Sequence, residues 1–380
     1  MASGTTRRRK DGRGTREVGR CPARTSEKLP EYSAFPAHPQ EDSLGLGTGW
    51  GPCRFGARQP AYIGCLPLGE KALIARIRRR VRRGTGVAVG IGDDCAVLRV
   101  PPGHELLVTT DFSLEKVHFR REWHPPEVVG WRCLTRGLSD LAAMGGEPRA
   151  AFLSLALPRD ISQKWVDGFV NGLLALASKF GVTLAGGDVA QSRSGVLADI
   201  VVVGSVPRGR AILRSGARPG DGIYVTGQLG GGAAALMALR RGRKTGAEFE
   251  RYFHPQPRLA VGRRLRTRGV ASAMIDLSDG LSTDLAHICD ESGVGAVIDA
   301  PAIPLAEVGR NGIRADLRFG LHGGDDYELL FTASGRIPEK VERVRITRIG
   351  EIVKGRGVTL VDVRGRKSKL ATGGWQHFRG

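Results

Sequence analysis

Short apolar runs alternate with longer amphipathic segments along most of the chain from residue 69 onward. Runs that are rich in β-branched residues and bounded by Gly, Pro or Asp predict buried β-strands. These predicted strands cover residues 87–91, 105–109, 151–157, 182–185, 200–206, 222–225, 296–298, 328–332 and 345–349.

Between these runs, apolar side chains recur at the three- and four-residue spacing of an amphipathic helix. The clearest helical segments cover residues 126–144, 162–180, 232–241, 257–268 and 282–291. The alternation of strands and helices predicts a mixed α/β fold. Residues 207–219 are rich in Gly and Pro, which favours a domain boundary there. We therefore expect one domain over residues 63–206 and a second over residues 207–380.

The first 62 residues are different, because they are rich in Gly and Pro and have no sustained hydrophobic period. This composition is typical of low-complexity or disordered segments, so we expect an N-terminal extension over residues 1–62. A mobile arm and a start codon assigned too far upstream both explain it. The basic run at residues 7–10 is not followed by the apolar segment of a secretory signal.

Several classes of protein do not fit this sequence. The longest apolar runs, such as residues 150–157, are much shorter than the roughly 20 residues that a membrane-spanning helix needs. The six cysteines form no C-x-x-C pair, so we expect ordinary reduced thiols. We expect a cytoplasmic protein with no membrane partner.

The chain has 58 Lys and Arg against 38 Asp and Glu, a net charge of +20, which invites a nucleic-acid interpretation. Basic residues cluster on a predicted short helix at residues 73–83, where arginines surround an apolar stripe. A solvated basic face explains this pattern without a partner, so we do not expect nucleic-acid binding. A basic DNA- or RNA-binding protein is the alternative from another functional class.

Aspartates recur in a distinctive setting, directly after an apolar run or inside a Gly-rich turn. Six segments share it: residues 92–94, 109–111, 138–140, 186–188, 276–280 and 323–326. Ligands of α/β proteins bind in the crevice at the ends of neighbouring strands, so we expect several of these acids to share one site. Two carboxylates about 4 Å apart repel by about 4 kcal/mol at an effective dielectric constant near 20, so a cation is needed.

The type of donor indicates which cation this is. Neither His nor Cys recurs in the six segments, which offer carboxylates and hydroxyls instead. Such hard oxygen donors favour Mg²⁺ or Mn²⁺ over zinc. Mg²⁺ commonly pairs protein carboxylates with substrate phosphates, which suggests a nucleotide ligand. Taken singly, each acid has a structural explanation; Ser278 and Asp279, for example, could cap the following helix.

Other phosphate-binding signals are weak. The chain lacks a G-x-x-x-x-G-K-[ST] loop and the paired motifs of protein kinases. Residues 227–232 contain four glycines at the start of a predicted helix. Their backbone N–H groups could face an anion, or the glycines could allow close backbone packing.

A set of short motifs, taken in order and spacing, resembles the thiamine-monophosphate kinase family from about residue 69 to the C-terminus. The motifs are GEKALI (69–74), GIGDDCA (90–96), TTD (109–111), VHF (117–119), LSDLAAMG (138–145), GGD (186–188), RSGA (214–217), DLSDGL (276–281), GGDDYEL (323–329) and GWQHF (374–378). This resemblance implies a two-domain aminoimidazole ribonucleotide synthetase-like fold. It implies an N-terminal half that forms the dimer sheet, a C-terminal α/β half and a homodimer.

The resemblance also implies an activity, the transfer of the γ-phosphoryl group of ATP to thiamine monophosphate with several Mg²⁺ ions. It assigns metal binding to Asp94, Thr109, Thr110, Asp111, Asp140, Asp188, Asp276 and Asp279. It assigns ATP binding to Gly187, Asp188, Arg214 and Ser278, and substrate binding to His118, Asp325 and Trp375. A phosphate acceptor is already mostly ionised at neutral pH, so we expect direct in-line transfer without a general base.

Four positions depart from the family's usual residues: Lys116, Gly137, Val189 and Asp325. The alternative within the superfamily is an ATP-dependent synthetase that acts on a purine-pathway amide or on selenide. Selenide chemistry would need a reactive cysteine, and Cys53 and Cys65 lie near a Gly-rich stretch. The motifs at residues 276–281 and 374–378 favour the thiamine interpretation.

Overall fold

The computed structural model describes residues 69–82, 84–242, 249–308 and 313–375. Contacts divide the chain into Met1–Ala61 and Tyr62–Gly380, and every described element belongs to the second unit. The predicted N-terminal extension therefore lies outside the described residues. Within the described ranges, no helix has the length and apolar character needed to cross a membrane.

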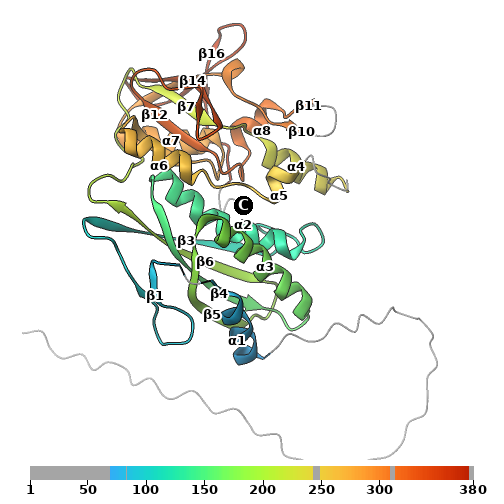
Figure 1. Cartoon of the computed structure of the whole chain (residues 1–380). Coiled ribbons are helices and arrows are strands. Elements are labelled where there is room, and N and C mark those ends of the chain that lie inside the picture. Colours follow the sequence, from blue (N-terminus) through green and yellow to red (C-terminus); the bar gives the residue numbers. More distant parts are fainter. Residues whose placement is uncertain (1–68, 83, 243–248, 309–312, 376–380) are drawn as a thin grey trace, which may run out of the picture. The chain divides into compact units, whose positions relative to one another are not determined.

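The first sheet belongs to the N-terminal half of the described chain. Its strand order is β3 (His104–Leu114), β6 (Leu197–Pro207), β4 (Glu147–Leu157) and β5 (Thr183–Gln191). The strands pair antiparallel except for β4 and β5, which run parallel. The parallel pair is joined by α3 (Gln163–Phe180), and α3 and α2 (Pro126–Ala143) cover one face of the sheet (Figure 1).

The two covering helices pack unusually closely. A Cβ atom added to Gly130 of α2 would lie 1.9 Å from the carbonyl oxygen of Phe169 in α3. One added to Gly172 of α3 would lie 1.8 Å from the carbonyl oxygen of Glu127. The two backbones therefore touch where only glycine fits. Helix α2 also packs on α6 (Leu259–Arg268) and β8 (Ala271–Asp276), so it lies in the core between the two sheets.

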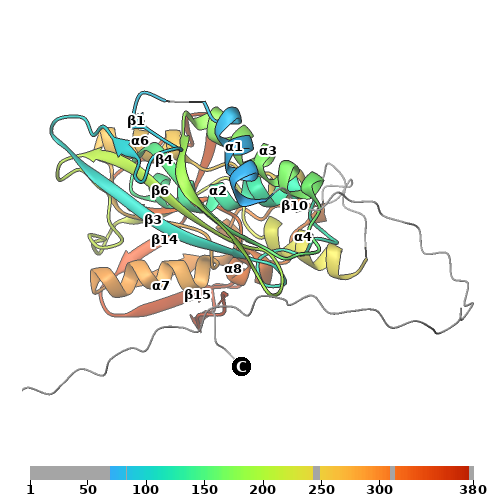
Figure 2. The same cartoon turned by 90° about the horizontal axis from the view of Figure 1, so that it is seen from below.

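The second sheet belongs to the C-terminal half (Figure 2). Besides β8, its strands are β7 (Gly222–Thr226), β9 (Gly295–Asp299), β12 (Leu329–Ala333), β14 (Val344–Val353), β15 (Gly357–Val361) and β16 (Lys367–Leu370). The order is β16-β15-β9-β14-β7-β12-β8, and β13 (Lys340–Val341) pairs with β14. Every residue of β7 and β12 is buried, as expected for central strands covered on both faces. A separate core lies between this sheet and α7 (Leu281–Ser292).

The shorter elements complete the fold. They are α1 (Glu70–Arg80), β1 (Val87–Val89), β2 (Val97–Leu98), α4 (Gly231–Arg240), α5 (Glu250–Phe253), the 3-10 turn Ala300–Ala302, β10 (Glu307–Val308), β11 (Ile313–Arg314) and α8 (Leu317–His322). The mixed α/β prediction is confirmed, and each predicted strand and helix coincides with an observed one. Strand β8 was missed because its sequence, rich in Ala and Ser, has little of the β-branched signal.

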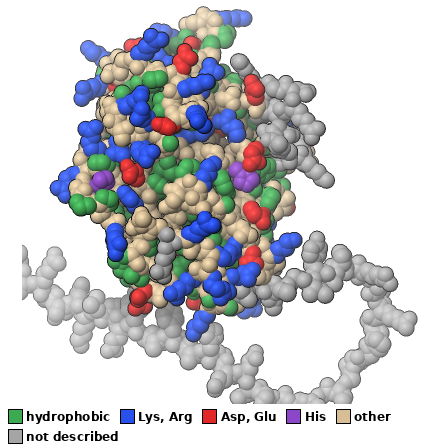
Figure 3. Space-filling model, viewed as in Figure 1, with side chains coloured by type: hydrophobic (Ala, Val, Ile, Leu, Met, Phe, Trp, Pro, Cys, Tyr) green, Lys and Arg blue, Asp and Glu red, His purple; other side chains and the backbone are tan. Residues whose placement is uncertain are grey.

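At least one basic residue of α1 makes an ion pair with another element of the fold. Arg76 makes a bidentate ion pair with Asp167 of α3, at 2.6 and 2.7 Å. Leu73 and Ile77 are the buried residues of this helix. On the face shown in Figure 3, Lys and Arg side chains are scattered among acidic and apolar ones rather than gathered into one patch.

Candidate active site

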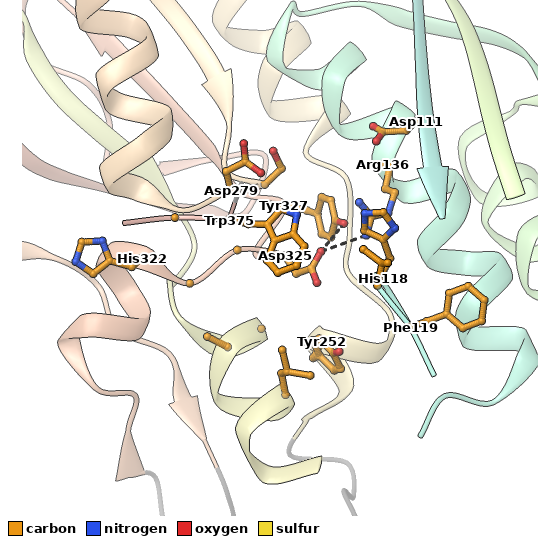
Figure 4. Close-up of a pocket in the computed structure, with 18 of the residues that line it drawn as sticks. Asp111, His118, Phe119, Arg136, Tyr252, Asp279, His322, Asp325, Tyr327 and Trp375 are labelled. Atoms are coloured by element: carbon orange, nitrogen blue, oxygen red, sulfur yellow. Dashed lines mark hydrogen bonds and ion pairs between the residues drawn. The ribbon is translucent and has the colours of Figure 1, made fainter. Parts of the chain in front are cut away.

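A cavity of about 550 Å³ opens between elements of both sheets and α2 (Figure 4). Its walls include β3, the segment that follows β3, α2, α4, the end of β8, α8 and the C-terminal segment. Eight of the residues singled out by the sequence line this one cavity: Asp111, His118, Asp140, Asp276, Ser278, Asp279, Asp325 and Trp375.

One end of the cavity is acidic. Asp111 comes from the interior of β3, Asp140 from α2 and Asp276 from the end of β8. Burial and the charge of Asp140 raise the pKa of Asp276 to about 7, and burial raises the pKa of Asp111 to about 6. The pKa of Asp140 is raised by burial as well. Burial, and for Asp276 the charge of Asp140, thus disfavour the ionised carboxylates, a penalty that a bound cation would relieve.

Hydroxyl groups support these carboxylates. The Thr109 hydroxyl donates a hydrogen bond to Asp140, and the Ser139 hydroxyl donates one to Asp276 at 2.7 Å. Within the described ranges, no set of three or more His, Cys, Asp or Glu is arranged to hold a metal ion by itself. This arrangement fits Mg²⁺, which is usually bound by one or two carboxylates together with waters and substrate phosphates.

The opposite wall is formed by residues 323–327. Asp325 and Tyr327 both adopt positive φ, 65° and 51°, which is uncommon for residues other than glycine. The Tyr327 hydroxyl donates to Asp325 at 2.7 Å. Arg132 and Arg136 also face Asp325, at 2.8 and 3.5 Å. Burial alone would raise the pKa of Asp325, but the two arginines outweigh it and lower this pKa to about 2, so the carboxylate stays ionised.

The polar and aromatic side chains around Asp325 are held from several elements. The backbone N–H of Leu114 donates to Nδ1 of His118 at 3.0 Å, which leaves the proton of a neutral imidazole on Nε2. The C-terminal segment is held by its backbone, because Trp375 N–H donates to the carbonyl of Asp279 at 3.1 Å. The Trp375 ring lines the cavity while half of its surface stays exposed.

Six of the predicted site residues do not line the cavity: Asp94, Thr109, Thr110, Gly187, Asp188 and Arg214. The alternation of β3 explains Thr110, whose hydroxyl donates to Asp199 while neighbouring Thr109 faces Asp140. The strand register aligns Asp188 with Ser154, Asp199 and Phe112, on the face of the sheet away from the cavity.

Asp94 and Arg214 lie outside the cavity for other reasons. Asp94 lies in the exposed turn between β1 and β2, where its N–H donates to Asp93. Arg214 lies outside the cavity walls. Its positive charge nevertheless favours the ionised forms of Asp140 and Asp276, and so partly offsets the rise of both pKa values. Several of the acids therefore line one cavity, as expected, whereas Asp94 and Asp188 do not.

Two local expectations change with the structure. The glycine-rich loop before α4 does face an anion, but this anion is the protein's own Asp326, which accepts from Gly230 N–H at 2.7 Å and Gly232 N–H at 3.3 Å. Helix α7 begins after Gly280, whose N–H donates to Asp284. The alternative in which Ser278 and Asp279 cap this helix is therefore wrong, and both residues line the cavity instead.

Sequence reasoning missed several cavity residues, among them Phe119, Trp123, Arg136, Tyr252 and His322. Arg136 could have been found, because it precedes Asp140 by one helical turn and so lies on the same face of α2. Tyr252 belongs to the four-residue helix α5, which is too short to give a periodic signal.

Comparisons with known proteins agree with this geometry. The N-terminal domain model of the AIR synthase related proteins matches residues 92–206, and the corresponding C-terminal domain model matches residues 218–363. The two-sheet fold, with its cavity between elements of both sheets, is thus that of an AIR synthase related protein.

Relatives within this class narrow the assignment. The thiamine-monophosphate kinase of Salmonella typhimurium is 40% identical over 293 residues, which is 75% of this chain and 87% of that protein. The crystal structure of thiamine-monophosphate kinase from Stenotrophomonas maltophilia has a TM-score of 0.69 at 36% identity and covers 80% of this chain and 98% of that one. AaThiL complexed with AMPPCP and TMP has a TM-score of 0.64 at 30% identity, covering 86% and 100%. The chain belongs to the thiamine-monophosphate kinase family.

Proposed function

We propose that this protein transfers the γ-phosphoryl group of ATP to thiamine monophosphate, giving thiamine diphosphate and ADP. The observation that carries the proposal is one cavity with buried carboxylates at one end and aromatic side chains at the other. A solved relative, AaThiL, was crystallised with AMPPCP and TMP together, which supports two phosphate ligands in this family. We retain residues 63–206 and 207–380 as the proposed domains.

Several Mg²⁺ ions are the proposed metals, each held by one or two of the carboxylates at the acidic end, Asp111, Asp140, Asp276 and Asp279, together with Thr109. When bound, Mg²⁺ would neutralise phosphate charge during the transfer. The burial of Asp111 and Asp276 supports this proposal, because a bound cation would stabilise the ionised forms that burial disfavours. Asp94, Thr110 and Asp188 remain proposed ligands on other surfaces of the chain.

The remaining residues receive proposed binding roles. Ser278 and Arg214 lie near the acidic end and would contact ATP there. Gly187 and Asp188 remain proposed ATP contacts outside this cavity. His118, Asp325 and Trp375 would bind thiamine monophosphate. Trp375 offers a flat face to the cationic thiazolium ring, and His118 offers an Nε2 proton to a phosphate oxygen. Asp325, kept ionised by two arginines, can accept a hydrogen bond from an amino group of the substrate.

The activity is tested with purified full-length protein, ATP, Mg²⁺ and thiamine monophosphate, using thiamine as the competing acceptor. We expect thiamine diphosphate to form, with little use of thiamine. A protein that makes no thiamine diphosphate under these conditions would contradict the proposal. In-line transfer further requires that no phosphoryl group stays on the protein after incubation with γ-labelled ATP.

A homodimer is proposed as the assembled form. Strand β3 lies at the edge of its sheet, and Leu106, Val108 and Phe112 are each more than half exposed on the side away from α2. A long apolar edge strand of this kind is a surface that proteins usually cover. Asp188 shares this face with Phe112, so a second copy would also bring the proposed ligand Asp188 into a buried setting.

Replacing Val108 with Asp is expected to dissociate the dimer, because a charge would be buried at the apolar contact. Light scattering after size exclusion should then give a mass near 40.7 kDa, the mass of one chain. Val363→Asp is the matched control, because Val363 is 81% exposed and lies outside this face. A monomeric wild-type protein, or a dimeric V108D variant, would refute the proposed interface.

The cytoplasm is the proposed location, since ATP is the proposed co-substrate. We propose no nucleic-acid partner. The ion pair between Arg76 and Asp167 supports a structural use for part of the basic surface.

A further inference from the structure

Arg136 occupies a special place on α2. Arg132, Arg136 and Asp140 follow one another at four-residue spacing, so they form a row along one face of the helix, with about 6 Å of rise between neighbours. Asp140 belongs to the acidic end of the cavity, whereas Arg132 lies next to Tyr252, with its guanidinium 4.5 Å from the ring centroid. Arg136 therefore stands between the acidic end and the aromatic end.

The charge of Arg136 acts on both ends. It attracts the carboxylates of Asp111 and Asp140 on one side and that of Asp325 on the other. In the close-up, Arg136 lies beside His118 and is joined to Asp325 by a dashed line (Figure 4). Two guanidinium groups face the single carboxylate of Asp325, and the charge of Arg136 is shared between Asp325 and Asp111.

The bonds made by the two arginines are unequal. Arg132 lies 2.8 Å from Asp325 and also donates to the backbone carbonyl of Tyr252 at 2.5 Å. Arg136 is only 3.5 Å from Asp325, and its Nε is buried without a hydrogen-bond partner among the described residues. Nη2 of Arg132 also lacks a hydrogen-bond partner there, but Arg132 has the bond to Tyr252. The Arg136 side chain is 12% exposed. A desolvated donor that the fold leaves unmatched is costly, which points to a role toward a ligand.

We propose that Arg136 binds the phosphate of the acceptor and thereby selects thiamine monophosphate over thiamine. This inference rests on the proposed function. The acceptor phosphate must reach the acidic, metal-binding end to receive the γ-phosphoryl group, while its rings need the aromatic end. The junction of the two ends is where Arg136 lies. A guanidinium presents its donors as a planar fork that matches phosphate oxygens, and its charge persists at every relevant pH.

The test compares the binding of thiamine monophosphate and of thiamine to the full-length protein by calorimetry with Mg²⁺ present. Arg136→Met is expected to weaken thiamine monophosphate binding roughly 10- to 100-fold, the usual effect of losing a charge-assisted hydrogen bond. Thiamine binding and the KM for ATP should change little. Arg318→Met is the matched control, because the Arg318 side chain is 80% exposed and lies outside the cavity.

Two results would overturn the inference. One is unchanged thiamine monophosphate binding in a folded R136M variant. The other is an equal loss for both ligands, which is what a residue that merely positions Asp325 would produce. If R136M does not fold, Arg136→Gln keeps hydrogen-bonding groups, removes the charge and is judged by the same criteria. Failure of the proposed function is distinct, because wild-type protein would then make no thiamine diphosphate.

Discussion

Asp276→Asn is expected to abolish phosphoryl transfer and, in the absence of metal, to make the protein more stable. Activity should fall by more than about 100-fold, beyond what the loss of a supporting residue around a metal site usually costs. Stability should rise because Asp276 is buried and repelled by Asp140, and an amide removes that charge. Asn can still accept the hydrogen bond that Ser139 donates.

The pH dependence of this gain has a definite sign. The pKa of Asp276 is about 7 in the fold against 3.8 for an ordinary aspartate, so the folded state holds the proton more tightly. Wild-type stability is therefore lost as the pH rises from about 4 to about 7, and the penalty is complete above that range. We expect the melting temperature of D276N in EDTA to exceed that of wild type by roughly 2–4 °C at pH 8, and the gap to close near pH 4.

Asp290→Asn serves as the control for this experiment, because Asp290 is exposed on α7. It should change neither activity nor melting temperature. A D276N variant with near wild-type turnover would remove Asp276 from the metal site. A lower melting temperature at pH 8 would show instead that the carboxylate stabilises the fold.

Glu328→Ala is expected to give the largest loss of stability. Glu328 is 1% exposed and accepts hydrogen bonds from Arg258, Arg251 and the Thr226 hydroxyl, at 2.5–2.8 Å. Removing it leaves the mostly buried Arg258 without its carboxylate, and breaking a buried ion pair in this way costs about 3–5 kcal/mol. The free energy of unfolding in urea should fall by this amount.

The matched control is Glu351→Ala, which removes an exposed carboxylate 3.0 Å from Arg348. Exposed pairs contribute about 0–1 kcal/mol, so little change is expected. If E328A and E351A destabilise the protein equally, burial of the Glu328 network does not matter and the argument fails. Glu328 follows the cavity residues Asp325 and Tyr327 directly, so its network also anchors that wall.

The sequence predicted that several acids converge, but the structure shows a different reason for it. The ends of neighbouring strands were expected to gather the carboxylates. The sheets are largely antiparallel, and Asp111 lies inside β3 because that strand runs to Leu114, beyond its predicted end at residue 109. Asp111, Asp140 and Asp276 meet because α2 packs between β3 and β8. A strand, a helix and a strand end thus each contribute one acid.

The greater length of β3 also explains why the side chains of the adjacent residues Thr109 and Thr110 point to opposite faces of the sheet. Thr109 and Thr110 looked equivalent at the end of a short strand, but inside a longer strand neighbouring side chains point to opposite faces. Thr109 therefore reaches Asp140 and Thr110 reaches Asp199. The glycine-rich loop before α4 shows a similar limit, since its anion is Asp326, nearly a hundred residues away along the chain.

The sequence by itself determined the types of element and the acid-rich segments, because hydrophobic period follows burial and turn residues follow backbone conformation. It also determined the family, through motifs kept in order. Only the tertiary structure decided which acids share the cavity, that Arg136 lies between its two ends, and that Asp326 fills the loop before α4. These outcomes depend on strand length, register and contacts between distant segments, which no local pattern encodes.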